Sequence, residues 1–386
     1  MVGPSVRILA VFALDIDRAA SFGLWEKALA LTAAARSSAL AVDVAAARGS
    51  TLFFESHEAS AAEQTHDAPA AVAPGALLRA YFRYDRFWRK LLGIPLHRYA
   101  AVWVRAFPTS PAQLNFLTAA KKAGCRIVLD LPTYPYRYDG PELWKRLGAI
   151  VGAWFDTRRM SLVDRVVTLS PDHEIGGVPT LRVRNGGAVV HGETSRPART
   201  NNGPYHFVGV GQWARAHGLS RLLEHVASSP LHREFKFTLA GEGPLVPELR
   251  ALSARLPLRI HFEGSVYGDR RRELIESGDV GVGALSYPGD GVEAYFPLKH
   301  RLYAAEGIPF IGTALDPDFA DHVGVCAVRA DELPPVAQLL AFAREARSSR
   351  EAWGDALRAT AEDLTWGKTY APLFDYFLTL EGPVAP

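Results

Sequence analysis

Short apolar runs alternate with amphipathic segments along the first half of the chain. The apolar runs are VRILAVFAL (6–14), LAVDVAAA (40–47), AVWVRAF (101–107) and CRIVLDL (125–131), and the amphipathic ones are GLWEKALALTAAA (23–35) and SPAQLNFLTAAKKAG (110–124). This alternation predicts parallel strands joined by crossover helices. Ser110 with Pro111 predicts a helix start, and Gly124 predicts its end. One more helix is expected within 141–164, leading into the strand RVVTLS (165–170).

The second half repeats this pattern. Strands are expected at YHFVGVG (205–211), FKFTLAG (235–241), IHFEGS (260–265), DVGVGALS (279–286) and IPFIGT (308–313), and helices at GLSRLLEHVA (218–227), VPELRALSARL (246–256), RRRELIESG (270–278) and after Pro297. The polar segment GETSRPARTNNGP (192–204) has no periodicity and predicts a domain boundary. We therefore predict an α/β protein with two Rossmann-like domains, residues 1–195 and 196–365. A helical segment, residues 366–386, is expected to pack back toward the N-terminal domain.

Composition indicates a soluble globular protein. Of the 386 residues, 48% are hydrophobic, and the formal net charge is +2. These values do not fit a disordered or membrane-spanning chain and give no global sign of nucleic-acid binding. Cys125 and Cys326 both lie in apolar runs, so we expect reduced core thiols, as in intracellular proteins. Because Asp15 and Asp17 interrupt the N-terminal apolar run, we predict a first strand there instead of a signal peptide, and a cytoplasmic protein.

A lysine stands where a helix least favours one. If Pro297 opens a helix and Gly307 follows its end, Lys299 lies in the first turn. Unpaired N–H groups and the helix macrodipole already place positive charge there. The sequence therefore predicts that an anion binds near Lys299.

Three glycine-containing loops connect a predicted strand to a predicted helix in the second half. Ligands of open parallel sheets bind beyond the carboxyl ends of the strands, where such loops lie. The loop GVGQWARAHGLS (209–220) leaves backbone N–H groups for a phosphate but lacks the dinucleotide-binding glycine spacing. LAGEGPLVPEL (239–249) allows close approach of a ligand, with a plain tight turn as the alternative. YPGDGVEAYFPLK (287–299) leads to Lys299, where a diphosphate fits best; a solvent-facing lysine is the alternative.

The order of these segments resembles that of a known enzyme family. Six segments follow one another as in the C-terminal half of retaining GT-B glycosyltransferases of the family 4 type. They are VVTLSPDHEIGGVPTLRVRNGG, HFVGVGQWARAHGLSRLLEHV, FTLAGEGPL, FEGSVYGDRRRELIESGDVGVGALSY, FPLKHRLYAAEGIPFIGT and LTWGKTYAPLFDYFL. FGLWEKALALTAAA and VLDLPTYPY extend the similarity into the N-terminal half. Any single motif is weak, but six in the same order are strong.

The resemblance implies a fold and an activity. It implies a GT-B fold, in which a cleft separates two Rossmann-like domains, and a retaining, metal-independent glycosyltransferase without a cofactor. The second domain is expected to hold a nucleoside-diphosphate sugar carrying a hexose or deoxyhexose. The first is expected to hold a saccharide or lipid-linked acceptor used in cell-surface polysaccharide or glycoconjugate synthesis.

The resemblance also implies roles for individual residues. Lys299 matches the family lysine that neutralises the donor diphosphate, and we assign catalytic roles to Lys299, Arg215 and Asp130. The residues expected to bind the donor are Gly211, Gln212, His217, Gly241, Glu242, Val266, Tyr287, Glu293, Pro297, Leu298 and Leu302.

Several positions depart from the family pattern. Leu302 stands where the family has a ribose-binding glutamate, and Ala294 replaces the glutamate of the preceding loop, next to Glu293. Gln212 and His217 occupy the positions of an arginine and a lysine. A non-catalytic saccharide- or nucleotide-binding relative and a nucleotide-sugar epimerase of the same fold are therefore the alternative functions.

Acceptor contacts are expected after the strands of the first half. LDLPTYPYRYDGPELW (129–144) follows the strand CRIVLDL and contains Asp130, Thr133, Tyr134 and Tyr136, which can hydrogen-bond to or stack on a sugar; a rigid proline turn is the alternative. Similar PTYPY segments occur in polysaccharide-assembly members of the family. Asp15 and Asp17 resemble the metal-binding pair of a different glycosyltransferase fold, but we favour an acceptor or loop contact for Asp15 and predict no metal site.

One segment combines basic and aromatic residues. Within GALLRAYFRYDRFWRKLLGIPLHR (75–98), helical spacing places Arg79, Arg83, Arg86 and Lys90 on one stripe, with Tyr81, Phe82, Phe87 and Trp88 interleaved. This pattern suits contact with an anionic membrane at the inner face of the plasma membrane, near a lipid-linked acceptor. A solvated helix face is the alternative, and a nucleic-acid surface is not favoured because no recognisable module accompanies it.

Overall fold

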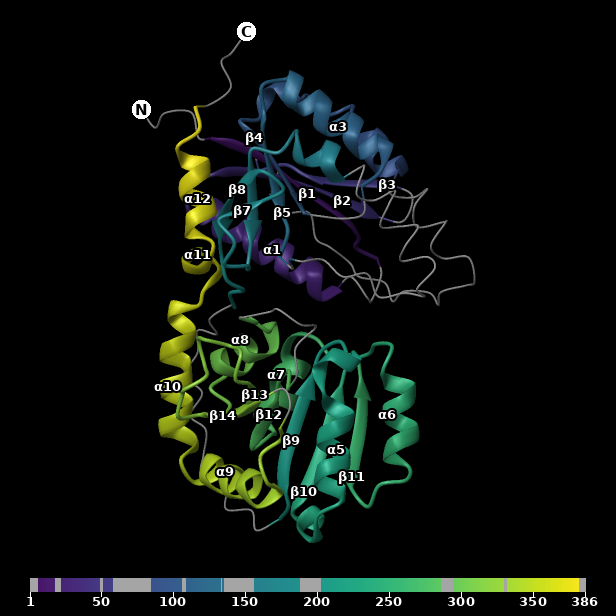
Figure 1. Cartoon of the computed structure of the whole chain (residues 1–386), viewed down its shortest axis with the longest axis vertical. Helices are drawn as coiled ribbons and strands as arrows, with labels where there is room; N and C mark the ends of the chain where they lie inside the picture. The colour runs from purple at the N-terminus through teal and green to yellow at the C-terminus, as the bar shows by residue number, and fades with distance from the viewer. Residues whose placement is uncertain are drawn as a thin grey trace. The chain divides into compact units, whose positions relative to one another are not determined.

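The chain forms two compact α/β units, one built on each half of the sequence (Figure 1). The computed structural model describes residues 6–17, 22–48, 51–57, 85–105, 109–132, 134, 156–187, 203–285, 294–329 and 332–381. The first unit comprises Met1–Arg184 and Tyr370–Pro386, and the second comprises Asn185–Thr369. The α/β class with two parallel-sheet domains is as predicted. Most of the predicted boundary segment, 192–202, lies outside the described residues.

The sheet of the first unit has the strand order β3-β2-β1-β4-β5-β6-β8-β7. Its strands are β1 (Arg7–Asp15), β2 (Ala41–Arg48), β3 (Thr51–Glu55), β4 (Ala101–Arg105), β5 (Arg126–Asp130), β6 (Arg165–Thr168), β7 (Glu174–Ile175) and β8 (Val178–Arg182). Pairing is parallel in the centre, and β3 and β7 pair antiparallel with β2 and β8 at the two edges. The central strands are buried on both faces, which explains their continuous apolar runs.

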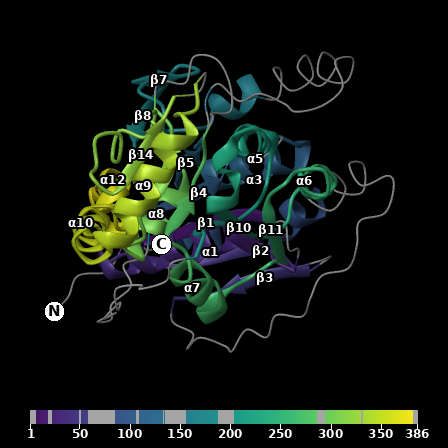
Figure 2. The same cartoon turned by 90° about the horizontal axis from the view of Figure 1, so that it is seen from below.

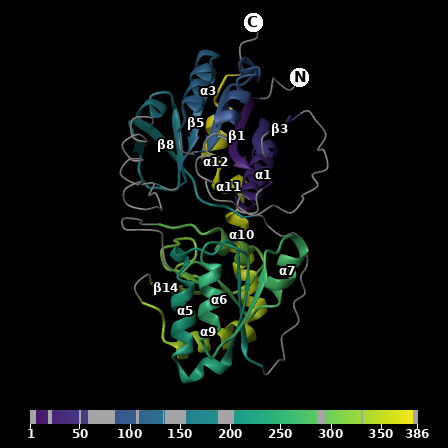
Figure 3. The ribbon, with the colours of Figure 1, turned by 90° about the vertical axis from the view of Figure 1, so that its right-hand side faces the viewer.

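Two long helices cover opposite faces of the first sheet (Figure 3). Helix α1 (Phe22–Ser37) links β1 to β2, and α3 (Pro111–Lys122) links β4 to β5 in the opposite direction across the sheet, so right-handed crossovers place them on different faces. The Ser110 hydroxyl caps α3 by accepting from the Gln113 N–H at 3.2 Å, and Gly124 ends the helix with φ of 89°. Both predicted signals for α3 are confirmed.

Two aromatic residues of the predicted basic and aromatic helix, Phe87 and Trp88, belong to the core. Residues 85–91 form a helix, in which Phe87 and Trp88 are 3% and 1% exposed and pack in the hydrophobic core of the first unit. Arg86 and Lys90 are exposed, whereas Arg79 and Arg83 lie outside the described residues. Phe87 and Trp88 therefore serve the core of the first unit, and membrane contact through the basic residues stays a prediction. Among the described helices, none is long and apolar enough to cross a bilayer.

The sheet of the second unit is parallel throughout, in the order β11-β10-β9-β12-β13-β14. Its strands are β9 (Tyr205–Val210), β10 (Phe235–Ala240), β11 (Arg259–Gly264), β12 (Val280–Val282), β13 (Phe310–Thr313) and β14 (Val325–Val328). The connecting helices are α5 (Leu219–Ala227), α6 (Val246–Ser253), α7 (Gly268–Glu276) and α8 (Leu298–Ala305).

These helices lie on both faces of the second sheet. Helices α5 and α6 run side by side in Figures 1 and 3, and Figure 2 shows α7 on the opposite face. The cause is the strand order, because the chain moves one way from β9 to β11 and then returns to β12 on the other side of β9. The point of reversal, between β9 and β12, brings the loop after β9 close to α8.

The C-terminal helices belong to both units. The second unit contains α9 (Val336–Ser348), α10 (Arg350–Asp363) and α11 (Trp366–Thr369), and the first contains α12 (Ala371–Leu378) beside β8 (Figure 1). Tyr370 and Phe377 are fully buried against Trp103 of β4. Cys125 and Cys326 are buried free thiols, as expected.

Candidate functional site

Helix α8 begins and ends where the sequence indicates. Pro297 is its N-cap residue, Lys299 lies in the first turn, and Gly307 follows the C-cap with φ of 60°. No acidic residue stands in the first turn. The positive end of the helix dipole and the lysine therefore add to each other without an internal counter-charge from α8.

The ammonium of Lys299 is buried without a hydrogen-bond acceptor. Within the described part of the chain, its Nζ has no hydrogen-bond partner. Nζ lies over an aromatic face, 3.7 Å from the centroid of the Trp213 ring. Burial lowers the pKa of Lys299 to about 7. An ammonium with three unused donors is unfavourable in this setting, so an anion that accepts from it is strongly favoured.

Trp213 joins the loops that follow β9 and β10. Its backbone N–H donates to the Glu242 carbonyl at 2.7 Å, and its indole N–H donates to the Ala240 carbonyl at 3.2 Å. The Leu245 N–H in turn donates to the Trp213 carbonyl at 3.3 Å. These hydrogen bonds join the two predicted ligand-binding loops, 209–220 and 239–249, into one surface beside Lys299.

Gly241 is required where these loops meet. Its φ is 117°, in the left-handed region, and a Cβ there would overlap the Gly211 carbonyl oxygen. We expect Gly241→Ala to lower the free energy of unfolding by about 2 kcal/mol or more, since strain and overlap act together. Urea unfolding measures the loss. Gly367→Ala is the matched control, because a Cβ at Gly367 meets nothing within 4 Å; equal stability of the two variants would contradict the requirement.

His217 stands near Lys299 as a neutral side chain. Burial, and then the charge of Lys299, lower the pKa of His217 to about 3. Its Nδ1 accepts from the Ala214 N–H at 3.3 Å, and its carbonyl accepts from the Leu285 N–H at 3.1 Å. Where the resembled family has a lysine, this chain therefore has an uncharged imidazole.

Arg215 lies apart from Lys299. Its side chain is 84% exposed and pairs with Glu248 of α6 at 2.7 Å. The two residues line a surface pocket of about 350 Å³ together with Gly218, Ser220, Arg221 and Glu224. In the described part of the chain, no contact joins Arg215 to Lys299. The structure therefore does not bring these two predicted catalytic cations together.

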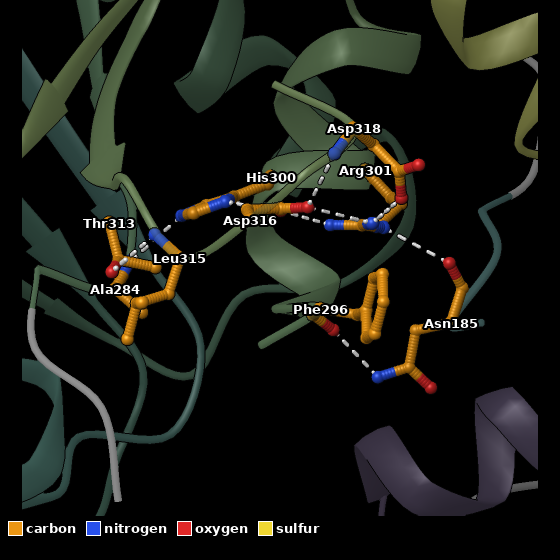
Figure 4. Close-up of polar contacts among 9 residues, drawn as sticks. All are labelled: Asn185, Ala284, Phe296, His300, Arg301, Thr313, Leu315, Asp316 and Asp318. Carbon is orange, nitrogen blue, oxygen red and sulfur yellow. Dashed lines mark hydrogen bonds and ion pairs between the residues drawn. The ribbon is translucent and has the colours of Figure 1, made fainter. Parts of the chain in front are cut away.

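His300 fixes the first turn of α8 through buried hydrogen bonds to the neighbouring loops. Its Nδ1 lies 2.8 Å from the Asp316 carboxylate, and its Nε2 accepts from the Ala284 N–H at 3.2 Å (Figure 4). Because a backbone N–H can only donate, the proton of the neutral ring is on Nδ1. A Cβ on Gly283 or Gly312 would approach the ring within 2.5 Å, so the two glycines make room for it.

Arg301 links α8 to two other segments, the loop after β13 and the segment at Asn185. Its guanidinium pairs with Asp316 and Asp318, and its Nε donates to the Asn185 carbonyl at 3.0 Å (Figure 4). The Asn185 amide donates to the Phe296 carbonyl at 2.7 Å, directly before α8. Burial alone would raise the pKa of Asp316, but the His300 hydrogen bond and the Arg301 charge hold it below its usual value. The residues on either side of Lys299 in the sequence, Phe296 before it and Arg301 after it, are therefore held in place by these contacts.

The remaining predicted donor residues are spread around this centre. Gln212, Glu242 and Leu298 are exposed, Pro297 is buried, and Val266 and Leu302 are half-buried against an apolar cluster of the second unit. Tyr287 and Glu293 lie outside the described residues. The structure brings together Gly211, His217 and Lys299, and a Cβ on Gly211 would lie 3.0 Å from the Lys299 Cε.

The first unit contains its own buried charges at the carboxyl ends of β4 and β5. Asp130 is fully buried and pairs with Arg105 at 3.3 Å, and its second oxygen has no hydrogen-bond partner among the described residues. Burial lowers the pKa of Lys27 to about 7, aided by Arg105 and opposed by Asp130. Asp15, at the end of β1, is buried, and Tyr134 is 40% exposed. These charges make this sheet edge the candidate acceptor region of the unit.

Two predicted acceptor residues, Thr133 and Tyr136, lie outside the described residues. In the described ranges, no group of three or more His, Cys, Asp or Glu side chains could hold a metal ion.

Sequence reasoning missed eight residues of these sites. They are Trp213, His300, Arg301, Asp316, Asp318, Asn185, Lys27 and Arg105. A histidine and an arginine directly after Lys299, on a helix otherwise rich in apolar residues, were the available signal, because charged side chains on a buried helix need partners. Nothing in the spacing of Trp213 or Lys27 indicated their role.

Comparison with known proteins identifies the fold of the chain. No protein-family model and no curated protein matches the chain. HepE of Anabaena, solved with UDP, superimposes with a TM-score of 0.60 at 13% identity, over 96% of this chain and 100% of HepE. A glycosyltransferase of Rickettsia africae ESF-5 gives 0.57 at 12%, over 97% and 99%. The chain has the GT-B fold.

Other structures with the GT-B fold agree. The lipopolysaccharide outer core galactosyltransferase WaaB matches with a TM-score of 0.53 at 12% identity, over 96% of this chain and 99% of WaaB. HepE has also been solved with UDP-glucose. The predicted GT-B class is thus confirmed at identities that establish the fold alone. Within this GT-B chain, the buried Lys299 ammonium stands beyond the carboxyl ends of the second sheet, where parallel sheets bind ligands.

Proposed function

We propose that this GT-B protein is a retaining, metal-independent glycosyltransferase. It moves a hexose or deoxyhexose from a nucleoside diphosphate to a saccharide or lipid-linked saccharide in cell-surface polysaccharide or glycoconjugate synthesis. One observation carries the proposal: the Lys299 ammonium is buried beside glycine-rich strand-to-helix loops without an acceptor among the described residues. A diphosphate supplies the missing acceptors and the missing negative charge.

In this proposal Lys299 binds the phosphate that leaves the sugar. The bond between the anomeric carbon and the phosphate oxygen breaks, the acceptor hydroxyl oxygen bonds to that carbon on the same face, and its proton passes to the departing phosphate. Negative charge grows on the phosphate during this step, and the positioned ammonium stabilises it. Arg215 is a second candidate cation and acts only after it leaves Glu248, and Asp130 is proposed to contact the acceptor.

The second candidate function is a non-catalytic saccharide- or nucleotide-binding protein. Leu302 favours it, because an apolar, half-buried side chain stands where the resembled family has a ribose-binding glutamate. Arg215 adds to this alternative because its charge is engaged at the surface.

A thermal-shift panel with UDP, GDP, dTDP and their sugars tests the proposal. A ligand that binds only the folded state raises the melting temperature in proportion to its affinity. We expect one nucleoside diphosphate and its sugar to raise it, and that sugar nucleotide to be hydrolysed slowly without an acceptor. Binding without any turnover would favour the non-catalytic protein, and no shift with any member of the panel would contradict both the transferase and a nucleotide-binding protein.

A further inference from the structure

Trp213 holds the Lys299 ammonium against the face of its ring. The side chain is 1% exposed, and its indole N–H is already bonded to the Ala240 carbonyl. Only the π-face is therefore directed to Nζ, 3.7 Å from the ring centroid. A Cβ on Gly209 would lie 2.7 Å from the indole, so this glycine provides the space for the ring.

An aromatic face differs from a carboxylate as a partner for an ammonium. A carboxylate would cancel the charge and compete with an incoming anion, whereas the quadrupole of an indole attracts the cation and leaves its net charge unchanged. The attraction is of a size that changes an equilibrium by roughly three- to thirtyfold, with the larger value in a desolvated site. Trp213 therefore keeps Lys299 in place while its charge stays available to a ligand.

The other polar groups around Lys299 do not replace the indole. His217, from the loop after β9, is neutral, and His300 and Arg301, which directly follow Lys299 on α8, are engaged with Asp316. Glu242, from the loop after β10, has an exposed side chain and bonds Trp213 through its carbonyl.

We propose that Trp213 is a positioning residue for the donor diphosphate, holding the Lys299 ammonium at the point where the diphosphate binds. This inference rests on the proposed function and deepens it, since it assigns the orientation of the binding cation to a residue that never needs to touch the sugar. It also makes binding proton-linked. In the protein without ligand, Lys299 loses its proton near pH 7, whereas a bound diphosphate keeps Lys299 protonated. The affinity for the diphosphate therefore falls as pH rises above about 7.

Titration calorimetry with UDP between pH 5.5 and 8.5 tests the role of Trp213. We expect Trp213→Leu to lower the affinity at pH 6 by about tenfold and to move the onset of the pH-dependent decline to lower pH, because the ammonium loses its cation–π partner. Trp213→Phe keeps an aromatic face and should retain most of both properties. A purely structural role would lower the folded fraction without moving the pH profile.

Trp353→Leu is the matched control, because Trp353 packs against the same hydrophobic cluster but stacks on Phe342. It should leave the UDP affinity and its pH profile unchanged. Wild-type affinity and profile in Trp213→Leu would overturn the inference, while failure of the wild type to bind UDP, GDP and dTDP would overturn the proposed function instead.

If Trp213→Leu does not fold, indole N–H NMR of the wild type decides. The Trp213 resonance, assigned with Trp213→Phe, should shift on addition of UDP and titrate near pH 7 in the free protein. A resonance that responds to neither would overturn the positioning role.

Discussion

Replacing Lys299 with methionine is expected to abolish donor binding while making the protein more stable. Methionine keeps most of the volume and removes the charge. Transfer should fall by at least about a hundredfold, the scale for removing one preorganised charge from a reacting site, and UDP affinity should fall with it. The free energy of unfolding should rise, because a buried ammonium without a hydrogen-bond acceptor among the described residues is removed.

The gain in stability has a defined pH dependence. The pKa of Lys299 is about 7 in the folded protein and has its ordinary value of 10.5 in the unfolded chain. The unfolded chain binds more protons between these values, so wild-type stability rises with pH across this window. The advantage of Lys299→Met should therefore be largest below pH 7 and shrink toward pH 10.5.

Urea unfolding and UDP titration of the same samples provide the measurement. Lys368→Met is the control, because Lys368 is 58% exposed and pairs with Asp363 at the surface. It should change neither property appreciably. A Lys299→Met protein that binds UDP as the wild type does, or one that is less stable at pH 6, would contradict the assignment.

Replacing Asp316 with alanine is expected to destabilise the second unit by about 3–5 kcal/mol, the usual loss when one partner of a buried ion pair is removed. Asp316 is fully buried and accepts from both His300 and Arg301 (Figure 4). Without it, the buried guanidinium keeps only Asp318 as a carboxylate partner in the described structure. UDP affinity should also fall, since His300 and Arg301 hold the helical turn that carries Lys299.

Urea unfolding checks this loss, with Asp355→Ala as the matched control. Asp355 is 66% exposed in a surface pair with Arg358, so its removal should cost at most about 1 kcal/mol. The pKa of Asp316 is lowered in the folded state, so its stabilising effect is present above the ordinary carboxyl range and is lost as pH falls through the lowered value. The difference between Asp316→Ala and the wild type should shrink in acid. Equal losses in the free energy of unfolding for the two alanine variants would contradict the stabilising role of the buried network.

The fold and the position of Lys299 were predictable because the signals that specify them are local. Apolar runs, Ser110 and Gly124 fix strand and helix limits within a few residues of each signal, and Pro297 with Gly307 does the same for α8. The parallel arrangement follows from alternation of the two kinds of segment. Arg301 and Asp316 lie on different elements, so no local rule predicts that they pair, although an arginine on a buried helix indicates that it needs a partner.

The helix at residues 85–91 shows a different limit of prediction from sequence. Basic and aromatic side chains alternate there, and the same amphipathic pattern suits a lipid surface or a protein core. Phe87 and Trp88 pack in the core of the first unit, which decides between the two for these residues. Trp213 was missed because its role depends on the distance between a loop and a helix that only the folded chain brings together.

A crystal structure of the wild type with UDP tests the central claim most directly. We predict a diphosphate oxygen about 2.8 Å from the Lys299 Nζ, with the ammonium still beside the Trp213 ring. UDP bound elsewhere, with the Lys299 ammonium left without an acceptor, would contradict it.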